Sequence, residues 1–187
     1  MDIHLIRHPR TVAPLGMCYG SMDLEPDPDH LSADAARLSP AIPANARFVA
    51  SSQQRARKLA EALAGDRPVV TDDRLVEMDF GEWEGKDWDA LPRNHVDAWA
   101  ANVTGYIPPG GESVEGVAAR VLDWWQSVEI EDTPLVIVSH GGPLRILAAH
   151  VTGAPLGQSM AFEIQWGHRA LIWHNPGRTA LAGWNIR

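Results

Sequence analysis

The sequence predicts an α/β protein, a three-layer α/β/α sandwich built around a mixed, mainly parallel central sheet. Short apolar runs alternate along the chain with stretches of helical spacing, a pattern typical of mainly parallel sheets. These runs contain few polar residues, as expected for strands covered by helices on both faces. We find no internal repeat or domain linker, so residues 1–187 are expected to form a single domain.

The expected strands are brief and apolar. The clearest is LVIVS at residues 135–139, and IHLI near the start belongs to a strand over residues 2–6. Both runs have the length of strands and lack turn residues. The expected strands are 2–6, 47–50, 68–71, 135–139, 162–166, 170–174 and 181–186.

Helices are expected between the strands. Ser32 is a candidate cap for a helix over residues 31–38, and Ser113 for one that extends to residue 128. Pro143 occupies the favoured first position of a helix that follows a turn at Gly141-Gly142. A helix over residues 87–101 is expected to break at Pro92. The expected helices are 31–38, 56–64, 87–101, 113–128 and 143–150.

Charge and cysteine content limit the possible partners. The 187 residues include 24 acidic and 16 basic side chains, a formal net charge of −8, so we expect neither nucleic acid nor a membrane as a partner. Cys18 is the only cysteine, which excludes an internal disulfide and fits a reducing compartment. We find no membrane-spanning run or signal-peptide layout, and we therefore expect a cytoplasmic protein. The sequence does not define an oligomeric state.

Two histidines follow apolar runs in the same way. IHLIRH ends in Arg7-His8, and LVIVSHGG ends in His140 and two glycines. If both strands are parallel neighbours, the two histidines emerge at the same carboxyl edge, where open α/β sheets place their ligands. The helix that begins near Pro143 would direct its N–H groups toward the same space, which favours an anion.

Five ordered motifs extend this pattern over nearly the whole chain: RHPRT, SSQQRARKLAEAL, LVEMDFGEWEG, PPGGES and VSHGGPLRIL. Together they resemble the histidine phosphatase superfamily, the phosphoglycerate mutase-like group, and its phosphatase branch more closely than its mutases. The stretch GMCYGSMDLEP also resembles the α-ribazole phosphatases within that branch. The resemblance implies the phosphoglycerate mutase-like fold.

The resemblance implies a role for each matching residue. His8 would be the nucleophile, since a neutral imidazole attacks phosphorus at pH 7 without prior deprotonation. Arg7 and Arg55 would clamp the phosphoryl oxygens, which guanidinium groups match in shape and charge. His140 would donate a hydrogen bond to the same oxygens. Glu77 would be the proton donor and later the base, although Asp79, Glu82 and Glu84 are close in sequence and leave this assignment open.

The chain departs from the family pattern at its first motif. The usual Arg-His-Gly-Glu-Thr is Arg-His-Pro-Arg-Thr here. Pro9 lacks an N–H that could face phosphate, and it restricts His8 to extended geometry. Arg10 adds positive charge near the mouth of the expected site. Substrate contacts are expected from Thr11, Tyr19, Gly20 and Gly141.

The function implied is a metal-independent phosphomonoesterase that acts through a phosphohistidine. Its partner would be a small phosphate monoester, with α-ribazole 5′-phosphate of cobalamin biosynthesis as the leading substrate. No cofactor or metal is implied, and the sequence contains no HExxH motif or cysteine pair.

Three alternatives remain open. The first is a broad-specificity phosphatase for sugar or nucleotide monophosphates. The second is a phosphoglycerate mutase, which is less favoured because residues 85–112 contain only Lys86 and Arg93 as cations. The third is an inactive relative that binds a phosphorylated ligand. The third is disfavoured because the chain retains the nucleophile, both clamp arginines, the second histidine and the acid.

Overall fold

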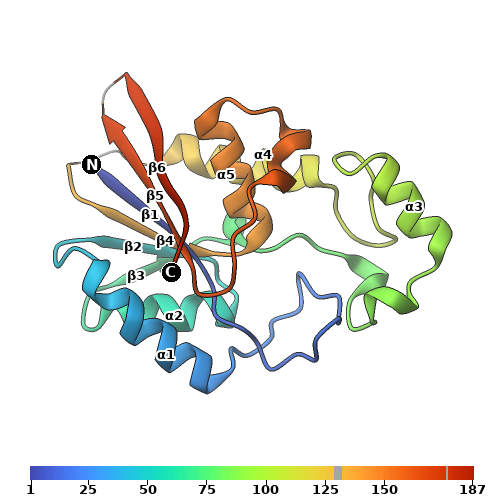
Figure 1. Cartoon of the computed structure of the whole chain (residues 1–187), viewed down its shortest axis with the longest axis horizontal. Helices are drawn as coiled ribbons and strands as arrows, with labels where there is room; N and C mark the ends of the chain where they lie inside the picture. Colours follow the sequence, from blue (N-terminus) through green and yellow to red (C-terminus); the bar gives the residue numbers. More distant parts are fainter. Residues whose placement is uncertain (129–131, 176) are drawn as a thin grey trace.

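The computed structural model describes residues 1–128, 132–175 and 177–187. Within these residues six strands form one sheet in the order β3-β2-β4-β1-β5-β6 (Figure 1). The strands β1 to β4 pair in parallel, whereas β5 and β6 are antiparallel, so the predicted mixed, mainly parallel sheet is confirmed. The strands are β1 (Asp2–Arg7), β2 (Arg47–Ala50), β3 (Val69–Thr71), β4 (Leu135–Ser139), β5 (Arg169–Asn175) and β6 (Arg178–Ile186).

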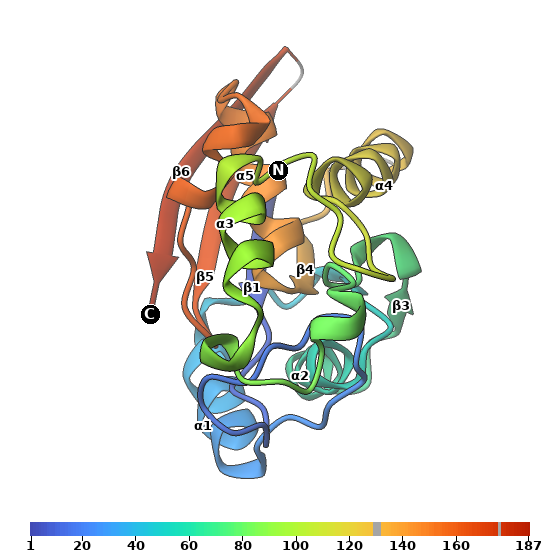
Figure 2. The same cartoon turned by 90° about the vertical axis from the view of Figure 1, so that its right-hand side faces the viewer.

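Helices cover both faces of the sheet, as the three-layer prediction requires (Figures 1 and 2). Side chains alternate between the two faces of a strand, so each strand serves two cores. On one face Ile6 and Phe48 pack against α1 and α2, with Leu59 of α2 fully buried. The helices are α1 (Pro28–Leu38), α2 (Gln54–Ala64), α3 (Arg93–Ala101), α4 (Val114–Ser127) and α5 (Gly141–Thr152).

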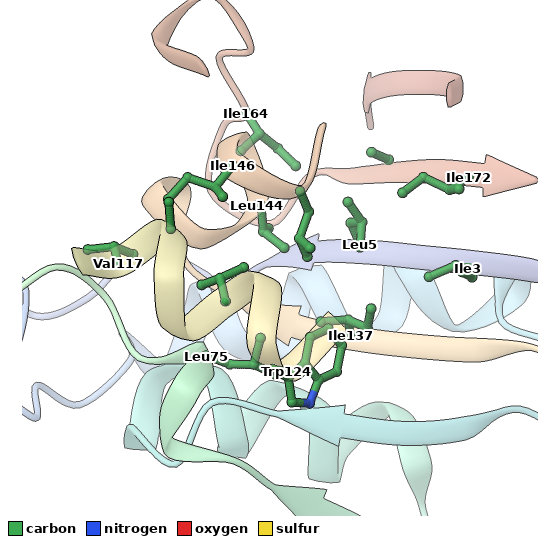
Figure 3. Close-up of a cluster of buried hydrophobic side chains, with 14 of the residues drawn as sticks. Ile3, Leu5, Leu75, Val117, Trp124, Ile137, Leu144, Ile146, Ile164 and Ile172 are labelled. Carbon is green, nitrogen blue, oxygen red and sulfur yellow. The ribbon is translucent and has the colours of Figure 1, made fainter. Parts of the chain in front are cut away.

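The larger core lies on the opposite face, between the sheet and helices α4 and α5 (Figure 3). Ile3 and Leu5 of β1 and Ile137 of β4 point toward Trp124 of α4 and Leu144 of α5, and all five side chains are 0–3% exposed. This packing fixes β1 and β4 relative to the start of α5. It therefore positions the ends of both strands, where the two histidines follow.

Three sequence predictions were wrong in detail. Residues 162–166 form no strand, although their apolar and polar residues alternate. Helix α1 begins at Pro28, and Asp27 rather than Ser32 caps it by accepting hydrogen bonds from the Asp29 and His30 amides. Gly141 and Gly142 belong to the first turn of α5 rather than to a turn before it.

The expected break at Pro92 is present. The short 3-10 helix η4 (Trp88–Ala90) precedes it, and α3 follows, apart from the sheet at the right of Figure 1. Across the described part of the chain, we find no helix whose length and hydropathy would suit a membrane span.

Candidate active site

The two histidines emerge at neighbouring strand ends. Strands β1 and β4 pair in parallel with Arg7 opposite Ser139, and the backbone N–H of His8 donates to the Ser139 carbonyl at 2.9 Å. His8 and His140 follow directly, with ring centroids 5.0 Å apart. Both side chains are at most 2% exposed, so the fold joins two residues that are remote in sequence within one buried site.

A backbone contact fixes the tautomer of His8. Its Nδ1 lies 2.6 Å from the carbonyl oxygen of Pro9. A carbonyl oxygen only accepts hydrogen bonds, so Nδ1 carries the proton and Nε2 keeps a free lone pair. Burial, followed by the positive charges of Arg55 and Arg7, lowers the pKa of His8 well below its usual range. The imidazole is therefore neutral, with one nitrogen prepared to act as a nucleophile.

His140 is held by a serine from a third strand end. Its Nε2 lies 2.8 Å from the hydroxyl oxygen of Ser51, which follows β2. Its Nδ1 is buried and has no hydrogen-bond partner among the described residues. Burial lowers the pKa of His140 well below its usual range, and the charge of Arg55 contributes next. An anion placed beside this ring would offset part of that effect.

Arg55 enters the site from the first turn of α2 and is fully buried. Its Nη1 donates to the Met22 carbonyl at 2.7 Å, and its Nη2 donates to the Gly20 carbonyl at 2.6 Å. The guanidinium carbon lies 5.4 Å from the centre of the Tyr19 ring. Burial lowers the pKa of Arg55, and the negative charge of Glu77 opposes this shift. The loop after β1 therefore holds a buried cation with no ion-pair partner among the described residues.

Arg7 is held from the other side of the site. Its Nη1 donates to the Ile164 carbonyl at 2.6 Å, and its guanidinium carbon lies 4.9 Å from the Trp166 ring centre. Its Nε is buried and unpaired among the described residues. A Cβ added at Gly141 would lie 3.5 Å from the guanidinium carbon, so the start of α5 packs directly on this cation.

Glu77 is bound to the amino end of α5. One carboxylate oxygen accepts from the Met78 amide at 2.9 Å, and the other accepts from the Gly142 amide at 3.2 Å. The approach requires a glycine, because a Cβ added at Gly142 would lie 2.3 Å from Oε1 of Glu77. Of the four carboxylates that the sequence left open, this one lines the cavity beside His8.

Two of the other nearby carboxylates, Glu84 and Asp79, have structural contacts instead. Glu84 accepts from the amides of Ser21 and Met22 at 2.6 and 2.7 Å, and thereby fixes the loop that holds Arg55. Asp79 accepts from the Gly81 amide at 2.7 Å. Its two amide contacts therefore give Glu84 a structural role in this loop.

Most of these groups line a cavity of about 350 Å³, whereas His140 is fully buried and does not line it. Among the described residues, four arginines and a single carboxylate, that of Glu77, line it. The site is therefore basic although the chain carries a net charge of −8, and it suits an anionic ligand. The four arginines are Arg7, Arg10, Arg55 and Arg145.

The predicted substrate contacts divide into two groups. Thr11 and Tyr19 line the cavity together with every predicted core residue of the site except His140. Gly20 and Gly141 do not line it. Gly20 lies behind Arg55, where its carbonyl accepts hydrogen bonds and a Cβ would lie 1.8 Å from the Met78 carbonyl oxygen. Gly141 is buried under Arg7.

Sequence reasoning missed three contributors. The Gln53 amide joins separate segments: its Nε2 donates to the Gly20 carbonyl at 2.8 Å, and its Oε1 accepts from Arg55 and from the Glu77 amide. Trp166 covers Arg7, and Arg145 lines the cavity from α5. No local signal marks Trp166, which lies 159 positions from its partner in the sequence.

The mixed six-stranded sheet with helices on both faces is the phosphoglycerate mutase-like fold. The model of the histidine phosphatase superfamily (branch 1) matches residues 3–187, and the chain therefore belongs to this superfamily. A curated relative, the glucosyl-3-phosphoglycerate phosphatase of Mycolicibacterium vanbaalenii, is 32% identical over 163 residues, which cover 74% of this chain and 71% of the relative. Matches to other curated relatives span 30% to 63% of those proteins.

Two solved structures are similar over almost the whole chain. The α-ribazole phosphatase from Shigella flexneri superposes with a TM-score of 0.85 at 26% identity, covering 99% of this chain and 96% of that one. A mycobacterial glucosyl-3-phosphoglycerate phosphatase solved with VO3 gives a TM-score of 0.83 at 28% identity, covering 100% and 99%. These similarities support the predicted phosphatase branch.

Proposed function

We propose that this protein is a metal-independent phosphomonoesterase that acts through a phosphohistidine on His8. The observation that carries the proposal is the 2.6 Å contact between Nδ1 of His8 and the Pro9 carbonyl, which leaves Nε2 as a free nucleophile beside two arginines. Pro9, which replaces the family's usual glycine, supplies this contact through its backbone carbonyl, which a glycine would also have.

The reaction follows in two displacements. Nε2 of His8 attacks phosphorus, the bond between phosphorus and the ester oxygen breaks, and Glu77 gives its proton to the leaving alkoxide. Water then attacks the phosphohistidine while Glu77 takes a proton from it, and the bond from phosphorus to Nε2 breaks to release phosphate. Arg7, Arg55 and His140 would bind the equatorial oxygens, where negative charge is spread during transfer.

The leading candidate substrate is α-ribazole 5′-phosphate. Its support is the likeness to the Shigella α-ribazole phosphatase over nearly the whole chain. The second candidate is an ester that also carries a carboxylate, as in glucosyl-3-phosphoglycerate. That candidate is favoured by Arg10 and Arg145, which line the cavity in addition to the two clamp arginines.

A quench experiment tests the mechanism. With para-nitrophenyl phosphate and EDTA, we expect turnover that survives the chelator and a phosphoenzyme that is labile in acid and stable in base. His8→Ala should form no phosphoenzyme and should lose turnover by about three orders of magnitude or more. His150→Ala, an exposed histidine on α5, is the matched control. Near-normal turnover in His8→Ala would assign the nucleophile to another residue, and no turnover of the unmodified protein from about pH 5 to 8 would favour a phosphate-binding protein.

A further inference from the structure

A second cavity of about 190 Å³ adjoins the cavity beside His8. It lies among α3, α4 and α5, which Figure 2 shows with α3 in front of α5 and α4 beside them. We call it the side cavity. Its walls are formed mainly by apolar and aromatic side chains, among them Trp88, Trp99, Val114, Val117, Ile146 and Met160.

The two cavities share a boundary at the proton donor. Glu77 lines both of them, as do Phe80, Trp88 and Arg145. A leaving oxygen must lie within hydrogen-bond reach of the acid that protonates it, about 2.6–3.2 Å. The carbon atoms attached to that oxygen therefore lie at the entrance of the side cavity.

We propose that the side cavity binds an aromatic ring on the leaving alcohol, so that the preferred substrates are phosphate monoesters of aryl-bearing alcohols. The inference rests on the proposed function and specifies its substrate class. Ligand sites of enzymes commonly combine apolar walls with a few polar groups in this way.

The shape and chemistry of the walls favour a flat ring over a sugar. Trp88 and Trp99 stack with ring centroids 5.7 Å apart, and Phe80 meets Trp88 edge-on at 5.5 Å, so one wall is aromatic. An apolar protein cavity of roughly 150 Å³ is known to take up benzene, a size comparable to this one. Moving sugar hydroxyls from water into contact with a wall that has few hydrogen-bonding groups would cost free energy.

Arg145 adds a second reason. Its Nη1 lies 3.8 Å from the sulfur of Met160, and its Nε is buried without a hydrogen-bond partner among the described residues. No ion pair of Arg145 is found in the described part of the chain. A guanidinium at the edge of an aromatic-lined cavity can lie over the face of a bound ring, an attractive arrangement.

A matched pair of esters tests the proposal. Ethyl phosphate and 2-phenylethyl phosphate both release a simple primary alkoxide, and they differ in the phenyl group alone. We expect kcat/KM for 2-phenylethyl phosphate to exceed that for ethyl phosphate by about ten- to a hundredfold, because the ring is removed from water. Equal values would overturn the inference while leaving the phosphatase function intact.

Two variants locate the effect. Val114→Phe fills the side cavity from α4, and Met160→Trp fills it from the 3-10 helix η5 (Leu156–Ala161), where Met160 is 45% exposed and tolerates a larger side chain. The ratio of the two kcat/KM values should fall toward one in either variant. Val70→Phe makes the same change as Val114→Phe at an exposed position of β3, and should keep the wild-type ratio.

The possible outcomes distinguish a failure of this inference from a failure of the proposed function. A preference for the phenyl ester that persists in both filled variants would place the ring elsewhere and overturn the inference. The ratio of kcat/KM values is independent of the fraction of active enzyme, so partial misfolding of one variant does not affect it. Absence of turnover and of phosphoenzyme with every ester would instead remove the proposed function, and this inference with it.

Discussion

Acid should destabilise the ligand-free protein through its two buried site histidines. In the unfolded chain each imidazole titrates near pH 6.5. In the folded protein, burial and the neighbouring arginines lower the pKa of both His8 and His140 well below that value. Folding stability from these groups is therefore fully present above pH 6.5. It falls as the pH drops toward the folded pKa values, because the unfolded chain binds protons that the folded one does not.

The magnitude follows from the number of protons. Well below pH 6.5, each histidine that is charged only in the unfolded state lowers the free energy of unfolding by about 1.4 kcal/mol per pH unit, so the limiting slope of the pair is about 2.7 kcal/mol per unit. Burial also lowers the pKa of His4, and carboxylates titrate at lower pH, so the total slope includes other groups. The informative quantity is the difference in slope between the wild type and a variant.

Urea denaturation followed by tryptophan fluorescence measures this difference, and the chain carries eight tryptophans as reporters. In unfolding free energies measured at pH 7.5, 6.5, 6.0 and 5.5, the decrease between pH 6.5 and 5.5 should be smaller in His8→Gln than in the wild type by about 1 kcal/mol, because the unfolded imidazole goes from about half to about nine-tenths protonated over this range. His150→Gln removes an exposed histidine and should retain the wild-type slope. An unchanged slope in His8→Gln would show that His8 titrates alike in both states and would refute the argument from burial.

Two further predictions concern single side chains. Gly142→Ala should lower kcat by about ten- to a hundredfold, because the added Cβ would lie 2.3 Å from Oε1 of Glu77 and displace the acid. The control, Gly116→Ala, should keep kcat within about twofold of the wild type. Equal effects of the two changes in steady-state kinetics would contradict this prediction. Burial raises the pKa of the Cys18 thiol to about 12. Ellman's reagent at pH 8 should therefore label the native protein at least about a thousandfold more slowly than the urea-unfolded chain. Rapid labelling of the native protein would contradict this prediction.

The central part of the fold was readable because its signals are local. The strands β2 and β4 match the predicted residues 47–50 and 135–139, since apolar runs of this length, covered on both faces, leave few alternatives. The parallel pairing of β1 with β4 then brings His8 and His140 together, as the topology predicts.

The errors have long-range causes. Residues 162–166 alternate like a strand, but their apolar side chains serve three different contacts. Phe162 packs against Trp184, Ile164 is buried in the larger core, and Trp166 covers Arg7. In the sequence, apolar residues that alternate because each contacts a separate partner look the same as apolar residues that alternate on one face of a strand.

The same limit applies to the site. Gln53 and Arg145 act through neighbours that are distant in sequence, and nothing near them in the chain marks that role. The sequence predicts a turn at Gly142, because it cannot show that a carboxylate approaches the Cα of this residue. Its real constraint is steric, and it arises only when Glu77 packs on α5.

The position of β4 in the sheet bears on how the protein is made. Strand β4 lies between β1 and β2, yet the ribosome synthesises it long after both of them. A nascent chain that already contains His8, Arg55 and Glu77 still lacks β4, the strand that lies between β1 and β2. A translation product that ends before β4 therefore lacks the strand that pairs with both β1 and β2, and the ends of these two strands have no shared neighbour to hold them side by side.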